Sequence, residues 1–253
     1  LIIGWVGLSY WQQTQTLAGT MEGILFTLVL FGCVVAHEFG HALTARRYGI
    51  KTRDITLYPI GGVARLERMP AQPIQEFWVA LAGPAVNVVI AAVLFVWLTL
   101  SGALEPLAGL SLTVGSFIER LMLVNISLVL FNLIPAFPMD GGRVLRSLLA
   151  MRLEYTRATQ IAASIGQGLA FVFGFVGLFY NPFLIFIALF VWIGAGQEAS
   201  MVQMRTSLGG IPVGRVTITD FQMLSSHDTM GWPVGLILAN SQTEFSAVEN
   251  EHI

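Results

Sequence analysis

Two histidines and a glutamate near position 40 have the residue types and the spacing of a metal-dependent hydrolytic site. Residues 37–41 read His-Glu-Phe-Gly-His, the pattern H-E-x-x-H, inside an apolar run over 24–43 that should be helical. Residues four apart share one face of a helix, so His37 and His41 can point their imidazoles at one ion. Neutral imidazole suits zinc, and zinc lowers the pKa of bound water to about 7. We therefore predict a Zn²⁺ site with Glu38 as the base that takes a proton from this water.

A catalytic zinc usually has three protein ligands and one open position, so a third ligand is needed. Asp140 is the best candidate, because it follows two prolines that end a membrane helix on the same side as His41. Asp140 also starts an Asp-Gly pair, a common turn, so spacing alone leaves ligand and turn open. Cys33, four residues before His37, lies on the same helical face. A fourth protein ligand would close the site to water, however, and a lone membrane cysteine usually packs as a small buried apolar residue.

The composition places these residues in a membrane. Of the 253 residues, 55% are hydrophobic and only 11% are charged, which leaves too little polar surface for a soluble domain of this size. Ionisable groups in a membrane helix are costly and usually mark function. The basic residues form no face that suggests a nucleic-acid partner. The single cysteine excludes an intrachain disulfide and a four-cysteine metal cluster.

Five stretches reach or approach the roughly 20 apolar residues that cross a bilayer. They are about 21–45, 74–101, 115–135, 160–179 and 181–200. The apolar residues 1–8 lack an initiator Met, a basic leader and a cleavage site, and we interpret them as a truncated membrane helix. We expect an all-α polytopic membrane protein with about six transmembrane helices, the first one truncated.

The basic residues predict the orientation of this protein in the cell membrane. They gather in two loops: Arg46, Arg47, Lys51, Arg53, Arg65 and Arg68 in one, and Arg143, Arg146, Arg152 and Arg157 in the other. The positive-inside rule makes both loops cytoplasmic, because the opposite connections, 11–20, 102–114 and 181–182, contain no Lys or Arg. The active site then lies below the cytoplasmic surface. Arg120, near the outer end of its helix, is expected to form an ion pair, for which Glu119 is available.

Two stretches break the membrane pattern. Residues 54–58 alternate in polarity before the turn residues Pro-Ile-Gly-Gly, which predicts a short cytoplasmic β-hairpin within about 48–73. From about residue 209 the chain becomes polar, with a helical stretch near 227–240, which predicts a cytoplasmic module. We therefore divide the chain into a transmembrane core, 1–208, and a C-terminal module, 209–253.

At this point the sequence resembles the site-2 protease family of intramembrane metalloproteases, particularly its prokaryotic members that carry a C-terminal CBS module. The resemblance rests on H-E-F-G-H at 37–41, A-G-P-A-V-N at 82–87 and the stretch Asn132 to Arg143. It implies that Asp140 is the third zinc ligand. It also implies that Asn132 lies near the reacting peptide and could steady the oxyanion, with a helix cap or an interhelical hydrogen bond as the other role.

The same resemblance covers the end of the chain. The residues after Ile211 look like the first part of an α/β CBS domain, which stops at Ile253. CBS modules in this family normally occur as pairs, so an adenine nucleotide is expected to bind only through a complete CBS pair. In the membrane core, Gly83, Pro84 and Asn87 are expected to serve helix packing and kinking rather than chemistry.

The function that these observations favour is peptide hydrolysis inside the membrane, near its cytoplasmic side, as in regulated intramembrane proteolysis. Zinc would polarise the scissile carbonyl while Glu38 deprotonates the water and later protonates the leaving amine. The expected partners are the lipid bilayer and a single-span membrane protein, which must unwind before cleavage. An exposed strand edge near 55–66 could pair with this unwound segment, although residues 59–62 could equally form an ordinary turn.

Two other functions remain open. A metal transporter would use the same residues as a transient site, although the other helices supply no second set of acidic or His residues. A catalytically silent homologue would bind membrane proteins or sense nucleotide without cleavage. The presence of all the expected chemical residues argues against it.

Overall fold

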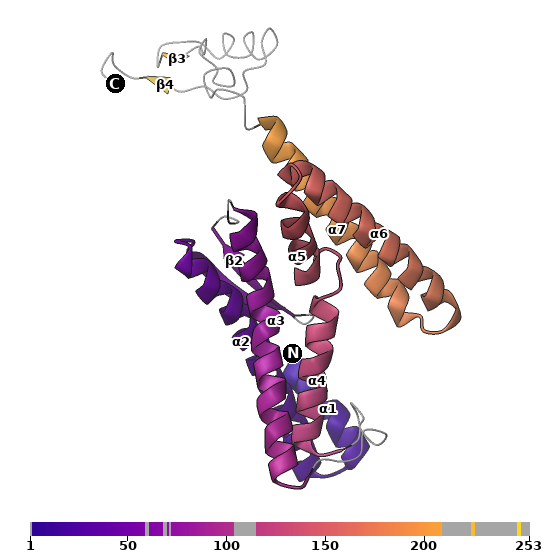
Figure 1. Ribbon diagram of the computed structural model, residues 1–253. Coiled ribbons are helices and arrows are strands. Elements are labelled where there is room, and N and C mark those ends of the chain that lie inside the picture. Colours follow the sequence, from indigo (N-terminus) through magenta and orange to yellow (C-terminus); the bar gives the residue numbers. More distant parts are fainter. Residues whose placement is uncertain are drawn as a thin grey trace. The chain divides into compact units, whose positions relative to one another are not determined.

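The computed structural model describes residues 2–58, 61–67, 70, 72–103, 115–208, 224–225 and 247–248. The chain divides into two compact units, Leu1–Gln203 and Met204–Ile253. The described helices are α1 (Ile2–Thr14), α2 (Leu17–Arg47), α3 (Pro73–Leu100), α4 (Phe117–Asn132), α5 (Asp140–Ala150), α6 (Tyr155–Phe179) and α7 (Phe183–Leu208). In the first unit α3 packs against α2, α4 and α5, as Figure 1 shows.

Four of these helices, α2, α3, α6 and α7, are long and apolar enough to cross a membrane. Many of their large apolar side chains are exposed, including Trp78, Val93, Phe175 and Phe186. Such surfaces suit lipid rather than water. The described chain is therefore mostly helical with four candidate membrane spans. Helix α1 has 13 residues and α4 has 16, so both fall short of the roughly 20 residues that a span needs. The expected count of six spans stays a prediction.

Local signals explain where several helices begin. Helix α4 starts with a capping box, in which the Ser116 hydroxyl accepts from the Glu119 N–H and the Glu119 carboxylate accepts from the Ser116 N–H. Helix α3 begins at Pro73, whose missing N–H would have had no partner there. The ion pair expected at Arg120 is present, with Glu22 of α2 as a partner. It joins two helices that are 98 residues apart in sequence at this point.

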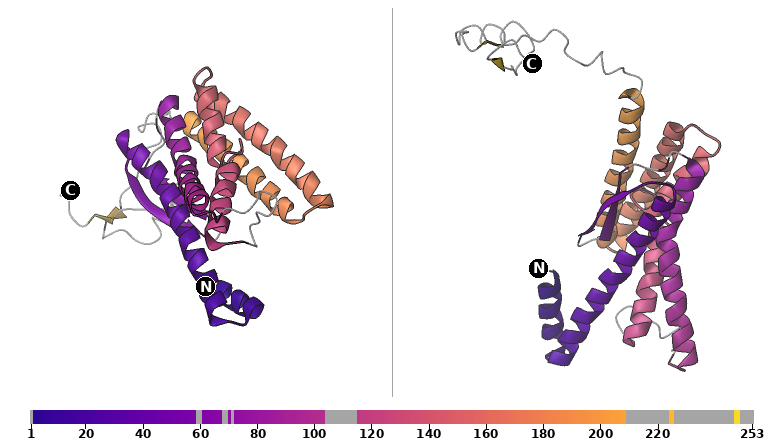
Figure 2. Two further views of the ribbon diagram at one scale, coloured as in Figure 1. Left: turned by 60° about the horizontal axis from the view of Figure 1, so that its bottom comes forward. Right: turned by 90° about the vertical axis from the view of Figure 1, so that its left-hand side faces the viewer.

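Strands β1 (Thr52–Tyr58) and β2 (Gly61–Leu66) form a two-stranded antiparallel sheet. They lie within the region where we predicted a hairpin, and the sheet contacts α2 (Figure 2). Residues 59 and 60, which would form the turn, lie outside the described residues. In the second unit the structure describes only β3 (Leu224–Ser225) and β4 (Ala247–Val248), which pair in parallel. The predicted partial CBS domain and its helical stretch therefore lie largely outside the described residues.

Helix α5 is fixed by a buried arginine. Arg146 is 0% exposed, and its Nε and Nη2 atoms donate to Oε1 of Glu76 on α3 at 2.8 and 2.5 Å. Its Nη1 donates to Glu198 on α7, and its guanidinium lies 5.0 Å from the ring centroids of both Phe137 and Tyr155. Burial opposes the charge, but Glu76 and Glu198 outweigh this effect and raise the pKa of Arg146. One side chain thus holds α5 against α3 and α7.

Removal of this cation should destabilise the protein. Arg146→Met would leave the Glu76 carboxylate buried without its partner, which typically costs about 3 kcal/mol or more. We expect a clear fall in the thermal unfolding midpoint in detergent. Arg146→Met with Glu76→Gln should recover part of it, because the fully enclosed position 76 then carries no unpaired charge, while the more exposed Glu198 keeps its own. Arg152→Met, at an exposed position just beyond α5, is the matched control. An Arg146→Met midpoint no lower than that of this control would contradict the role assigned to the pair.

Candidate metal centre

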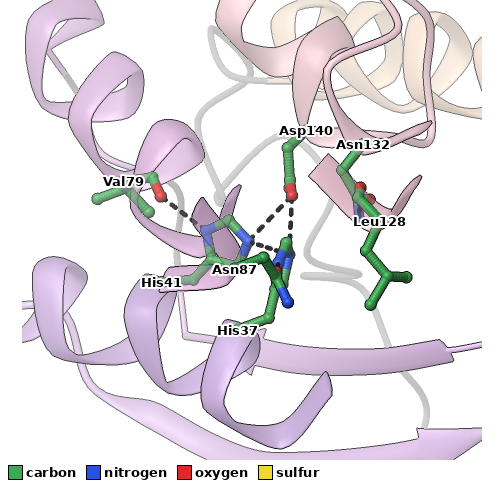
Figure 3. Close-up of polar contacts among 7 residues, drawn as sticks. All are labelled: His37, His41, Val79, Asn87, Leu128, Asn132 and Asp140. Atoms are coloured by element: carbon green, nitrogen blue, oxygen red, sulfur yellow. Dashed lines mark hydrogen bonds and ion pairs between the residues drawn. The ribbon is translucent and has the colours of Figure 1, made fainter. Parts of the chain in front are cut away.

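Three buried side chains from α2 and α5 meet at one point. Nε2 of His37, Nε2 of His41 and Oδ2 of Asp140 each lie 3.1 Å from the other two (Figure 3). The helical spacing of α2 places both imidazoles on one face, as predicted. Asp140 begins α5 and reaches the same point from 99 residues further along the chain than His41. The structure thus brings together the three predicted ligands as a group that could hold a metal ion.

The size of the group suits zinc. Zinc bonds to imidazole nitrogen and carboxylate oxygen are about 2.0–2.2 Å long, so ligand atoms at tetrahedral angles lie roughly 3.3 Å apart. The three separations of 3.1 Å are close to this value. Two nitrogens and one oxygen also leave one tetrahedral position for another ligand. This is the arrangement of catalytic rather than structural zinc sites.

The outer nitrogens of both imidazoles have acceptors, which fixes where their protons lie. Nδ1 of His41 is 2.7 Å from the backbone carbonyl oxygen of Val79. A carbonyl oxygen only accepts, so this Nδ1 must carry the proton. Nδ1 of His37 is 2.6 Å from Oδ1 of Asn87, another acceptor. Both Nε2 atoms therefore face inward, free of the proton that the neutral ring carries on Nδ1.

Two imidazole lone pairs and a carboxylate cannot converge in an apolar interior without positive charge. One source of this positive charge is a second proton on an imidazole. Burial disfavours the Asp140 carboxylate, but the charge on His41 and hydrogen bonds from both histidines lower the pKa of Asp140 well below its usual range. A divalent metal ion supplies the charge for all three atoms at once. The hydrogen bonds at Nδ1 are the outer contacts that metal-binding histidines typically make.

Helix α3 places a residue without a side chain, Gly83, against the three-residue group. A Cβ added to Gly83 would lie 2.6 Å from Nε2 of His37 and closer still to Nε2 of His41. Only glycine leaves that space open. Gly83 and Asn87 therefore contact the two histidines directly, which the expectation of helix packing and kinking for Gly83, Pro84 and Asn87 did not include. The signal was available in part, since Val79, Gly83 and Asn87 follow one another at intervals of four on one helical face.

The other predicted residues lie at different distances from this chemistry. Glu38 is buried on α2, directly after His37. Asn132 is the last residue of α4 and is half-buried, and its Nδ2 donates to the Leu128 carbonyl of its own helix at 3.0 Å. Figure 3 shows the Asn132 side chain turned toward Leu128. Cys33 is buried and lies outside the three-residue group in the part of the chain that the structure describes.

Comparison with known proteins places this site in a family. Residues 25–109 and 106–173 match the sequence model of peptidase family M50. The chain belongs to this family. The resemblance to site-2 proteases is thereby confirmed at the level of the family. Its subgroup with a CBS module stays a prediction, since the match ends before residue 209.

Relatives extend this result. A zinc metalloprotease of Methanocaldococcus jannaschii is 41% identical over 184 residues, which are 72% of this chain and 51% of the relative. Stage IV sporulation protein FB of Bacillus subtilis is 28% identical over 170 residues, which are 67% of this chain and 54% of that protein. The solved structure of the site-2 protease from Methanocaldococcus jannaschii matches with a TM-score of 0.56 and 37% identity, over 78% of this chain and 86% of that one. The chain spans about half the length of these two curated relatives.

The space beside Gly83 gives a direct test of the metal centre. Gly83→Ala places a methyl group against both Nε2 atoms, so we expect zinc affinity to fall at least about tenfold, in the range caused by disturbed ligand positions. The measurement is competition with a chromophoric chelator, together with the zinc content of the purified protein. Gly168→Ala on α6, where a Cβ would meet nothing within 4 Å, is the matched control. Wild-type affinity in Gly83→Ala would mean that the metal does not bind between these atoms.

Proposed function

We propose that this chain is the catalytic part of an intramembrane zinc metalloprotease that hydrolyses peptide bonds of membrane-spanning substrates near the cytoplasmic side of the membrane. One observation carries the proposal: two imidazole nitrogens from α2, a helix long and apolar enough to cross a membrane, converge with a carboxylate oxygen from α5 in a buried site. Membership of peptidase family M50 and the names of relatives as zinc metalloproteases support it. His37, His41 and Asp140 would hold the metal.

When bound, zinc supplies Lewis acidity, which polarises a carbonyl group and lowers the pKa of water. Glu38 is the general base: its carboxylate takes a proton from the attacking water. It then gives this proton to the leaving amine as the peptide C–N bond breaks, so one water is consumed for each bond cleaved. Its buried position next to a metal ligand keeps both transfers away from bulk water.

Asn132 has a supporting role in this proposal. Its side-chain amide would steady the oxyanion that develops on the scissile carbonyl. In the structure this amide donates to the Leu128 carbonyl. Rotation of the Asn132 side chain would free this donor. The Leu128 carbonyl would still have a partner, because it also accepts the backbone N–H bond of the helix. The position of Asn132 at the end of α4, on the segment that leads into Asp140 at the start of α5, supports this role.

The orientation and the span count are part of the same proposal. We propose about six membrane helices, with α1 and α4 added to the four candidate spans. Arg46 and Arg47 in the last turn of α2 support a cytoplasmic end there. The metal centre then lies below the cytoplasmic surface, and the C-terminus is cytoplasmic. A partial CBS domain over residues 209–253 would bind an adenine nucleotide only when completed to a pair.

Substrate entry would use the β1–β2 sheet. A membrane-spanning segment hides its amides in helical hydrogen bonds and must unwind before hydrolysis. A two-stranded sheet leaves one edge of each strand unpaired, so an unwound segment could add to it as a further strand. The contact of this sheet with α2, which carries the histidines, supports this route.

The metal transporter has weaker support. A transport path needs successive metal positions across the membrane. Within the described residues, the three-residue group is the one arrangement of His, Cys and carboxylate side chains suited to a metal ion. The silent homologue is disfavoured because the chain retains Glu38, the proposed base, directly after His37. Peptide hydrolysis is therefore the function that uses all of these residues.

Glu38→Gln should separate chemistry from metal binding. The amide has nearly the same shape but cannot take the proton from water, and loss of a general base typically costs at least about a hundredfold in rate. We expect cleavage of single-span substrates in liposomes to fall by this factor while zinc content stays at the wild-type value. The test uses a panel of substrates, because the natural one is not defined by this site. Equal cleavage rates for wild type and Glu38→Gln would show that Glu38 is not the base.

The sheet can be tested separately from the metal. Ile55 pairs with Ala64 across the two strands, and Ile55→Pro removes a backbone donor and disturbs this edge. We expect slower cleavage with unchanged zinc affinity. Ile55→Val keeps the strand and serves as the matched control. If Ile55→Pro cleaves as fast as Ile55→Val, the substrate does not pair with this sheet.

A further inference from the structure

A chain of buried hydrogen bonds links the metal centre to helix α4. It runs from His37 on α2 to Asn87 on α3, and from there to Asn125 on α4. Nδ1 of His37 is 2.6 Å from Oδ1 of Asn87, and Nδ2 of Asn87 is 2.8 Å from Oδ1 of Asn125. Both asparagines are 0% exposed. Buried amides among membrane helices are costly unless they are bonded, so each end of these side chains matters.

The orientation of Asn125 is fixed by its other contacts. Its Nδ2 lies 2.8 Å from the Leu121 carbonyl oxygen and 3.6 Å from Sγ of Cys33. The carbonyl oxygen can only accept. A flipped Asn125 would point its own oxygen at that carbonyl, which is repulsive. Oδ1 of Asn125 is therefore held toward Asn87.

The orientation of Asn125 determines that of Asn87, and through it the tautomer of His37. Because Asn125 presents an oxygen, Asn87 must present its Nδ2 on that side and its Oδ1 toward His37. His37 then keeps its proton on Nδ1 and directs the Nε2 lone pair at the metal position. If Asn87 were flipped, its NH₂ group would favour the other tautomer, with the proton on Nε2. That tautomer cannot bind a metal through Nε2.

The two histidines thus achieve the same tautomer by different means. His41 depends on the Val79 backbone carbonyl, which no side-chain change removes. His37 depends on an amide that could present either end. We propose that Asn125 is a positioning residue, which fixes the Asn87 amide and through it the metal-binding tautomer of His37. This inference rests on the proposed metal centre, and it adds a residue on α4 that touches neither metal nor substrate.

The test is a double-mutant comparison of zinc affinity. Asn125→Leu removes the acceptor that holds Asn87, so we expect zinc affinity to fall about tenfold, as for other outer contacts of metal-binding histidines. In Asn87→Asp either carboxylate oxygen can accept the Nδ1 proton of His37. The tautomer of His37 then no longer depends on Asn125. In the Asn87→Asp background, Asn125→Leu should therefore cause no loss of zinc affinity. A role in packing alone would lower affinity or stability equally in both backgrounds.

Two controls and one spectroscopic measurement complete the experiment. Cys33→Ala removes the weak contact at Asn125 without changing the amide chain, and it should bind zinc like wild type. Asn125→Ala gives the same comparison if Asn125→Leu does not fold. The visible spectrum of the Co²⁺-loaded protein should change in Asn125→Leu and stay the same between Asn87→Asp and its double variant.

The outcomes separate this inference from the proposed function. Wild-type protein that binds no zinc would refute the metal centre and the inference together. Zinc binding by wild type, with the same affinity in Asn125→Leu, would refute the inference alone. An equal tenfold loss in both backgrounds would show that Asn125 acts through packing and would also overturn it. A loss confined to the background with Asn87 intact is the result that we expect.

Discussion

The convergence of three electron-pair donors in an apolar interior is the constraint on which the rest of the structure depends. Lone pairs of His37 and His41 and the carboxylate of Asp140 repel one another unless positive charge lies between them. Their backbones must therefore be held in place by contacts outside the group. The structure provides such contacts: the Val79 carbonyl and the Asn87 amide accept from the imidazoles, and a buried arginine fixes the helix that begins with the aspartate.

One face of α3 organises most of this support. Glu76, Val79, Gly83 and Asn87 follow at intervals of three and four residues, and all are buried. Glu76 binds Arg146 and so holds the helix that begins with Asp140, the proposed third metal ligand. Val79 and Asn87 accept from the two imidazoles, and Gly83 leaves room between them. A single helix, which packs against α2, α4 and α5, thus supports both halves of the candidate metal centre.

The sequence predicted the parts of the site that depend on local spacing. Residues 37–41 define one helical face by themselves, so the two histidines and the helix around them followed from the pattern. Spacing did not identify Asp140 as the third ligand, because an Asp-Gly pair is also common in turns. Only the family resemblance favoured ligation over a turn. The role of Asn87 was missed, since periodicity predicts which face a residue occupies but not which distant helix packs there. The ion pair of Arg120 shows the same limit, because its partner Glu22 is 98 residues away.

The use of asparagines behind His37 follows from charge balance. A carboxylate at this position would hold the same tautomer more strongly, as it does in many zinc proteins. Asp140 and Glu38 already bring two carboxylates into this buried region. When ionised, these two match the charge of one divalent ion, and a third carboxylate would leave an uncompensated charge among membrane helices, where charge is costly. An amide adds no charge, but it can present either its oxygen or its NH₂ group to His37. Another contact must therefore fix its orientation. The Leu121 backbone carbonyl fixes the orientation of Asn125, and Asn125 in turn fixes that of Asn87. Two neutral amides thus support His37 without adding charge to an apolar bundle.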